Sequence, residues 1–480
     1  MPDNELHSQS AAQMAGMVRS KAISPIGLID AHLARIEDLQ PALNAFVTVD
    51  GDRARGQAKA AEEQLMRGDP VGPLHGVPIS IKSSISDAGL PCEAGSCLKQ
   101  GAIAQKDAVV VERLKRAGAI VLGTTNLPEM LMAYESDNPL YGRVNNPWDL
   151  ERTAGGSSGG ESAAVAACCS AGGIGSDSGG SVRIPAHFTG ICALKATPGR
   201  IPGTGHDPQC LGPFSLLGVV GPMTRTITDL EIFYEAIAGP DAGDVMADPV
   251  PVDRVSSDQL RKLRVGYFEQ EEDVPVSSET RKAVRDAART LHEQGFEVIP
   301  FRLKDLGEVR QVWWTFFTLG GATLLRQMYA GREHEMGPIL RDFMAMAAPE
   351  LPLSGERLMG AWLRRDQLRS QMMEQMQEVP VFISPVCSIP AFRHRERSWT
   401  VEGKTVEYLD AMSYTQWFNV LGNPCVVVPA SQSREGLPIG VQVVARPWQE
   451  HVALGIAKHI EHSFGWKQPP LAVTANAAHS

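Results

Sequence analysis

The sequence lacks several features that would assign it to a particular class. No run approaches the roughly 18 consecutive apolar residues of a membrane-spanning helix, so stable membrane insertion is not expected. Acidic residues outnumber basic ones by 55 to 45, and the net charge of −10 argues against nucleic-acid binding. The eight cysteines show no CxxC spacing and the N-terminus shows no secretory signal. These absences favour a cytoplasmic protein without a disulfide framework.

Two kinds of ligand site are also missing from the pattern. The glycine-rich segment at 155–160 lacks the GK[ST] ending of a phosphate-binding loop. His451, His459 and His462 lie near one another late in the chain, but no acidic or cysteine residue stands at ligand spacing beside them. We therefore expect no bound metal.

Short β-type runs alternate with helical periodicities along the chain. We expect a helix over 278–291, ended by Gly295, because apolar residues recur there at helical spacing. The expected strands cover 77–82, 119–122, 191–194, 263–267, 297–300, 425–428 and 440–444. Such alternation predicts a layered α/β protein.

The chain shows no internal repeat and no obvious linker, so we expect a single domain over 1–480. Within it, an N-terminal helical segment covers about 1–65, and the segment at about 305–376 is helical in pattern and rich in methionine. The motifs described next fall within about 72–230.

The most informative feature present is a glycine- and serine-rich stretch at 155–185, with Ser157 and Ser181 each inside a glycine cluster. Glycine clusters mark places where the main chain approaches something closely. The GxSxG pattern of a nucleophile elbow is matched at 155–159, but an elbow follows an apolar strand, and 145–153 is polar.

An alternative interpretation connects both serines to Lys82, at the end of the expected strand 77–82. Burial disfavours the charged form of a lysine and lowers its pKa, which makes the amine available as a base. A serine hydroxyl needs such a base because it is a weak nucleophile at neutral pH. A solvated lysine at the end of a strand is the competing interpretation.

Three motifs in order resemble the amidase signature family: GPLHGVPISIK at 72–82, GGSSGGE at 155–161 and SDSGGSVRIP at 176–185. The resemblance implies an α/β/α sandwich with a large mixed, mostly parallel twisted sheet covered by helices. It also implies a Ser–cis-Ser–Lys triad, with Ser181 as nucleophile, Ser157 as the cis-serine relay and Lys82 as base. No cofactor is implied.

The same resemblance suggests roles for the neighbours of the triad. Backbone N–H groups before the nucleophile would bind the oxyanion, at Ser178, Gly179 and Gly180. Three further residues are expected to support the site. Ser158 stands at the head of an expected helix over 159–170 and is either its cap or a hydrogen-bonding partner, and Asp177 is expected to pair with Arg183. The chain departs from the family pattern at Ser83, Ser176 and Ala196, which affects local packing rather than the triad.

The segment MLMAYESDNPLYG at 130–142 looks closer to fatty acid amide hydrolases than to the A subunit of glutamyl-tRNA amidotransferase. In that comparison Leu131 and Met132 match positions that line an acyl pocket. The aromatic run at 313–317 either adds to this pocket or forms a helical core. His206 either lines the site or is a plain loop residue.

The expected function is hydrolysis of an amide-type C–N bond in an apolar small molecule, as an amide, anilide or carbamate, through a seryl acyl-enzyme. A hydrolase with a histidine-based nucleophile elbow stays open, and so do two functions of other classes. One is an amidotransferase subunit that transfers ammonia within a multi-chain complex, and the other is a catalytically silent binding protein. A homodimer is also left open.

Overall fold

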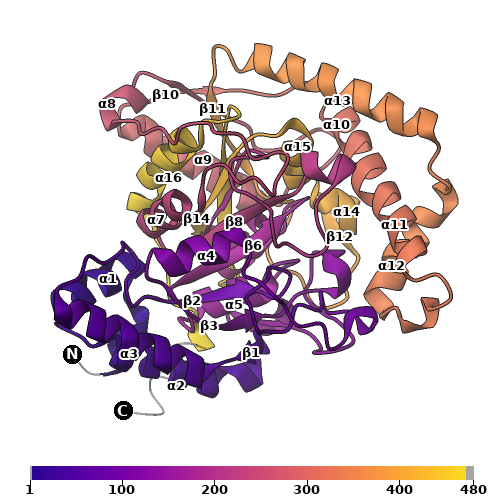
Figure 1. Ribbon diagram of the computed structural model, residues 1–480. Helices are drawn as coiled ribbons and strands as arrows, with labels where there is room; N and C mark the ends of the chain where they lie inside the picture. The colour runs from indigo at the N-terminus through magenta and orange to yellow at the C-terminus, as the bar shows by residue number, and fades with distance from the viewer. Residues whose placement is uncertain (1–2, 472–480) are drawn as a thin grey trace.

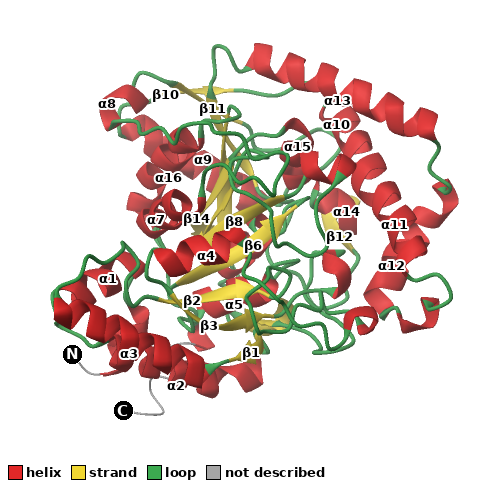
Figure 2. Cartoon of the chain, viewed as in Figure 1, coloured by secondary structure: helices red, strands yellow, loops and turns green. Residues whose placement is uncertain are grey.

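A computed structural model describes residues 3–471, in which 11 strands form one twisted sheet with helices on both sides (Figures 1 and 2). Its strand order is β1-β3-β2-β6-β8-β7-β14-β15-β11-β9-β10. In chain order these strands are β1 Phe46–Val49, β2 Pro78–Lys82, β3 Ile120–Thr125, β6 Gly172–Asp177, β7 Cys192–Lys195, β8 Val219–Thr224, β9 Arg264–Tyr267, β10 Glu297–Pro300, β11 Val381–Pro385, β14 Cys425–Gln432 and β15 Pro438–Ala445.

The sheet is mixed. Among the described residues four neighbouring pairs are parallel, β3–β2, β2–β6, β11–β9 and β9–β10. The other six pairs are antiparallel. Two small hairpins lie outside the sheet: β4 Asn145–Asn146 with β5 Asp149–Thr153, and β12 Ser398–Val401 with β13 Lys404–Glu407. The predicted α/β/α class with a large mixed sheet is confirmed, but parallel pairs are not in the majority, because the second half of the sheet includes antiparallel neighbours such as β14 and β15.

Helices cover both faces of the sheet because successive strand residues point to opposite faces and are apolar on both. In β14, Val426 and Val428 pack into the core beneath α7, α9 and α16, whereas Val427 packs with α6 on the other face. The helices are α1 Ala11–Arg19, α2 Pro25–Leu43, α3 Gly51–Arg67, α4 Val109–Arg116, α5 Gly159–Ala166, α6 Arg183–Thr189, α7 Ile227–Ile237, α8 Ser257–Leu260, α9 Ser278–Glu293, α10 Leu306–Trp313, α11 Gly320–Met328, α12 Pro338–Ala347, α13 Gly355–Gln375, α14 Tyr408–Ala411, α15 Ser413–Leu421 and α16 Glu450–Phe464.

The helices α10 to α13 form the orange edge of the molecule in Figure 1, at the opposite side from α1 to α3. A π-helical turn at Trp314–Leu319 joins α10 to α11. Such turns shift the register of a helix by one residue, and they occur frequently at functional sites. Its residue Phe317 lies at the cavity described below.

The strand β6 was not predicted, although it lies inside the sheet between β2 and β8. Its sequence GGIGSD contains glycines, which are depleted in strands and hide the β pattern. The helix expected over 159–170 ends at Ala166, so Cys168 and Cys169 follow it in a turn instead of lying within it. Cys168 has φ +62°, which a helix does not allow. All eight cysteines are free thiols.

The glycines of β6 make room for a buried carboxylate. A Cβ atom at Gly173 would lie 1.7 Å from Glu161 Oε1 and 2.6 Å from the Ser80 carbonyl oxygen. Both the buried Glu161 side chain and the Ser80 main chain are held in place. We therefore predict that Gly173→Ala lowers the free energy of unfolding, measured in urea titrations, by about 1–3 kcal/mol.

The matched control is Gly360→Ala in the exposed α13, where no atom lies within 4 Å of the added Cβ. This substitution should raise the free energy of unfolding by up to about 1 kcal/mol, because alanine favours a helix over glycine. Equal effects of the two alanines would contradict the packing account of β6.

Candidate active site

Three chain segments meet at one edge of the sheet. Lys82 is the last residue of β2, and Ser181 follows β6 by four residues. Because β2 and β6 are parallel neighbours, their carboxyl ends lie at the same edge, which is the edge where α/β proteins bind ligands. Ser157 lies in the loop between β5 and α5. The structure therefore brings together the three residues that the sequence singled out.

Lys82 is fully buried and contacts two serines. Its Nζ donates hydrogen bonds to Ser157 Oγ at 2.6 Å and to Ser176 Oγ at 3.1 Å. The peptide bond between Gly156 and Ser157 is cis. The Ser158 N–H donates to the Ser181 carbonyl at 3.1 Å, which fixes the two serine loops to each other. Ser157 and Ser181 share no direct hydrogen bond, but both side chains face the same cavity.

Burial sets the protonation of this centre. It lowers the pKa of Lys82 to about 7, although the Asp177 and Glu161 carboxylates nearby act in the opposite direction. Burial likewise raises the pKa of Glu161 to about 7, against the hydrogen bonds it accepts from Ser80 and Thr125. A substantial fraction of Lys82 is therefore neutral near pH 7, as a general base must be.

The loop that holds Ser181 is fixed by a buried ion pair. Arg183 donates to both Asp177 oxygens, with Nη2–Oδ1 at 2.9 Å and Nε–Oδ2 at 3.0 Å, and both side chains are fully buried. Burial alone raises the pKa of Asp177, but the Arg183 guanidinium reverses this and holds it well below its usual range. The pairing expected from the sequence is present.

The predicted oxyanion donors do not all remain available. The Gly180 N–H donates to Asp177 Oδ1 at 2.8 Å, so the carboxylate already occupies this group. The N–H groups of Ser178, Gly179 and Ser181 donate to no protein group in the described part of the chain. Gly180 instead has φ +128°, a conformation that side chains rarely adopt, and it turns the chain toward Ser181.

Several side chains that hold this loop were not found from the sequence. The Gly179 carbonyl accepts hydrogen bonds from Tyr134 Oη at 3.0 Å and from Thr415 Oγ1 at 2.7 Å. Trp313 Nε1 donates to the Ser178 carbonyl at 3.0 Å, and Asn419 contacts both Asp177 and Arg183. They come from distant segments, so no local pattern could have indicated them.

Ser158 does not cap α5 with its side chain, one of its two expected roles. Its hydroxyl instead donates to the Ser176 carbonyl at 3.3 Å and accepts from the Ser176 N–H at 3.3 Å. Ser176, noted above as a departure from the family pattern, thus contacts both Lys82 and Ser158. Across residues 3–471, no three histidine, cysteine, aspartate or glutamate side chains are grouped so that they could hold a metal ion.

The two serines face an apolar cavity of about 100 Å³. Both predicted pocket residues, Leu131 and Met132, line it. The other apolar walls are Met130, Phe214, Phe317, Leu324, Leu325 and Met328. Of the aromatic run, Trp313 and Phe316 belong to the helical core instead, while Trp314 lies in a separate groove.

The fold and the site define a class: an α/β/α protein in which a buried lysine contacts a serine at the head of an apolar cavity. Comparison with known proteins identifies the family. The Amidase family model matches residues 27–454. Indoleacetamide hydrolase of Bradyrhizobium diazoefficiens is 33% identical, over 97% of this chain and 88% of that protein.

The A subunit of glutamyl-tRNA(Gln) amidotransferase from an Anaeromyxobacter strain is 32% identical over 97% of this chain and 98% of its own length. The solved structure of a bacterial aryl acylamidase of the amidase signature family aligns with a TM-score of 0.86 and 26% identity, over 98% of each chain. The chain belongs to the amidase signature family, and it is an amidohydrolase that acts on amide C–N bonds. Within residues 3–471, every helix is too short or too polar to cross a membrane.

The buried ion pair allows a direct test. Asp177→Asn keeps the shape of the side chain but leaves the Arg183 charge buried without a counter-charge, which typically costs about 3–5 kcal/mol. We predict a loss of that size in the free energy of unfolding measured in urea.

Glu235→Gln is the control, because Glu235 pairs with Arg254 at 2.8 Å on the exposed surface. It should change the free energy of unfolding by less than about 1 kcal/mol. A loss at Asp177 no larger than at Glu235 would show that the buried pair does not hold the loop.

Proposed function

We propose that this chain hydrolyses amide-type bonds of apolar small molecules through a seryl acyl-enzyme, with Lys82 as base and Ser157 as proton relay. The observation that supports it most is the 2.6 Å contact from Lys82 Nζ to Ser157 Oγ, inside a buried centre that opens with Ser181 on one cavity. Localisation in the cytoplasm and a homodimer remain predictions from the sequence.

In the first step neutral Lys82 takes the proton of Ser157, and Ser157 takes the proton of Ser181 as Ser181 Oγ attacks the substrate carbonyl carbon. Collapse of the tetrahedral intermediate breaks the C–N bond. Ser157 returns a proton to the departing nitrogen and regains one from Lys82. Water then attacks the ester at Ser181 by the same relay, which releases the acid and restores the free serine.

The oxyanion of each tetrahedral intermediate needs donors placed before charge develops. The N–H groups of Ser178, Gly179 and Ser181 are the available ones beside the proposed nucleophile, whereas the Gly180 N–H is occupied by Asp177. Because the Asp177–Arg183 pair and the bonds to the Gly179 carbonyl hold this loop, the donors do not need to reorganise during the reaction.

The cavity indicates the substrate class. Its walls are mainly leucine, methionine and phenylalanine, so an apolar acyl group fits it. Anilides and carbamates with such a group meet the same requirement. Two of the similar proteins, the indoleacetamide hydrolase and the aryl acylamidase, have names that specify amides with an aromatic group, which supports this choice.

An amidotransferase subunit is the second candidate, since such a subunit is 32% identical. A free glutamine-like substrate carries an ammonium and a carboxylate, which need charged partners once they leave water. Among the described residues, no charged side chain lines the cavity. A cavity without charged side chains suits an apolar substrate better than a glutamine-like one. We therefore favour an enzyme that works alone over an amidotransferase subunit.

The proposal predicts that Ser181→Ala abolishes covalent labelling by a fluorophosphonate and lowers anilide turnover about 10⁴-fold or more. Intact mass spectrometry measures the label, and release of the aryl amine measures turnover. Lys82→Ala should slow labelling strongly. In the wild type the labelling rate should fall as pH drops through about 7, because Lys82 takes up a proton there.

A second buried lysine gives a matched control. Burial lowers the pKa of Lys195 to about 8, but its Nζ donates to the Ala196 carbonyl and the residue does not line the cavity. The fluorophosphonate should therefore label Lys195→Met at a rate within about threefold of the wild-type rate. A change of that size is expected from a small packing effect. Unchanged labelling of Ser181→Ala, or equal loss in the two lysine variants, would refute the triad.

A further inference from the structure

His206 lines the reaction cavity and carries a buried polar atom that has no hydrogen-bond partner among the described residues. The side chain is only 6% exposed, and it lines the same cavity as Ser157 and Ser181. Its Nε2 atom makes no hydrogen bond to any described residue. Buried polar atoms are nearly always paired, so an exception beside reactive groups points to a ligand that completes it.

The hydrogen bond at the other ring nitrogen fixes what Nε2 can do. Nδ1 lies 2.7 Å from the Pro208 carbonyl oxygen, which can only accept, so Nδ1 holds the proton. Burial, reinforced by the nearby Lys82 charge, lowers the pKa of His206 to about 4. The ring is therefore neutral at pH 7, and Nε2 is a pure hydrogen-bond acceptor.

Main-chain hydrogen bonds hold the His206 loop close to the segment that follows Lys82. The Asp207 N–H donates to the Ser84 carbonyl at 2.7 Å, and the Ser86 N–H donates to the Gly205 carbonyl at 2.9 Å. These bonds attach the His206 loop to the segment that follows Lys82 directly. The main-chain bonds therefore place the loop, and the Nδ1 hydrogen bond to Pro208 holds the ring within it.

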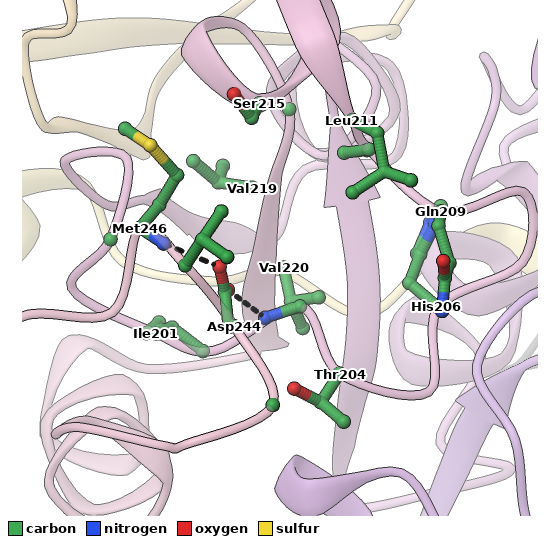
Figure 3. A pocket seen from close by; sticks show the side chains of 16 residues that line it. Ile201, Thr204, His206, Gln209, Leu211, Ser215, Val219, Val220, Asp244 and Met246 are labelled. Carbon is green, nitrogen blue, oxygen red and sulfur yellow. Dashed lines mark hydrogen bonds between the residues drawn. The ribbon is translucent and has the colours of Figure 1, made fainter.

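A second cavity, of about 80 Å³, adjoins the first, and His206, Gln209 and Cys210 line both. Figure 3 looks into this second cavity, with His206 and Gln209 at one end of the view and Asp244 and Met246 at the other. It is more polar, with Thr204, Ser215 and Asp244 among its walls. If the acyl group fills the apolar cavity, the departing amine leaves along the side where His206 stands.

We propose that His206 Nε2 accepts a hydrogen bond from the N–H of the departing amine and so selects substrates that carry one. These are primary amides and anilides, in preference to tertiary amides and esters. The proposal rests on the amide-hydrolase function above and adds to it a specificity-determining residue outside the triad. The imidazole acts by orienting the leaving nitrogen, while Ser157 supplies the proton.

The test compares three substrates with one apolar acyl group: an anilide, its N-methyl anilide and the phenyl ester. The variants are His206→Leu, which removes the acceptor, and His206→Gln, whose amide oxygen can replace it. Fluorophosphonate labelling counts the active sites in each preparation, so that kcat/KM refers to folded enzyme only. Phe214→Leu is the control for a general change in the cavity wall.

We expect His206→Leu to lower kcat/KM for the anilide roughly 5- to 10-fold, the size of one neutral hydrogen bond, and to leave the ester within about twofold. His206→Gln should keep most of the preference for the anilide over the ester. Phe214→Leu should change both substrates alike. The N-methyl anilide should respond to His206→Leu as the ester does.

Equal losses on the anilide and the ester in His206→Leu, or no loss on either, would overturn the role of His206 while leaving the amidase function intact. If His206→Leu does not fold, His206→Gln alone decides. Loss of the preference for the anilide over the ester in His206→Gln would then overturn the role of His206. Absence of wild-type turnover on all three substrates would instead refute the proposed function, and this inference with it.

Discussion

The full burial of the Lys82 amine is the constraint on which the rest of the site depends. An amine in water is protonated at neutral pH, and a protonated lysine cannot accept a proton from Ser157. The sheet provides the burial, because Lys82 ends a central strand whose five residues are all buried. Glu161 and Asp177 then limit the effect, since their negative charges keep the pKa from falling further. The protonation of Lys82, the proposed base, is therefore set mainly by its burial.

Ser181, the proposed nucleophile, is held in place by buried charges rather than by an apolar surrounding. Around Ser181 the structure keeps full charges in the interior and pairs them closely, with Arg183 against Asp177 and Asn419 bridging both. Such a network adds little net stability, but it specifies one arrangement of the loop. A loop so fixed presents its N–H groups and the Ser181 hydroxyl without reorganisation, which is what oxyanion stabilisation requires.

Local sequence patterns could predict the elements whose signal is local. The strand ending at Lys82, the helix begun at Ser278 and the strand 297–300 match the structure within a residue or two. The strand β6 was not predicted from the sequence because it is rich in glycine. Its glycines make space for Glu161 and neighbouring strands, and this requirement is visible only in three dimensions. For the same reason the contacts of Tyr134 and Thr415 with Gly179, and the occupied N–H of Gly180, could not be read from spacing.

Titration of the Lys82 amine shows whether this lysine is neutral near pH 7, as the proposed base must be. NMR of protein labelled at lysine ¹³Cε and ¹⁵Nζ can follow each amine, with Lys82→Met and Lys195→Met used to assign the two buried signals. We expect the Lys82 signal to titrate near pH 7. A Lys82 pKa near the ordinary value of about 10.4 would contradict it, because the amine would then be charged throughout the working range.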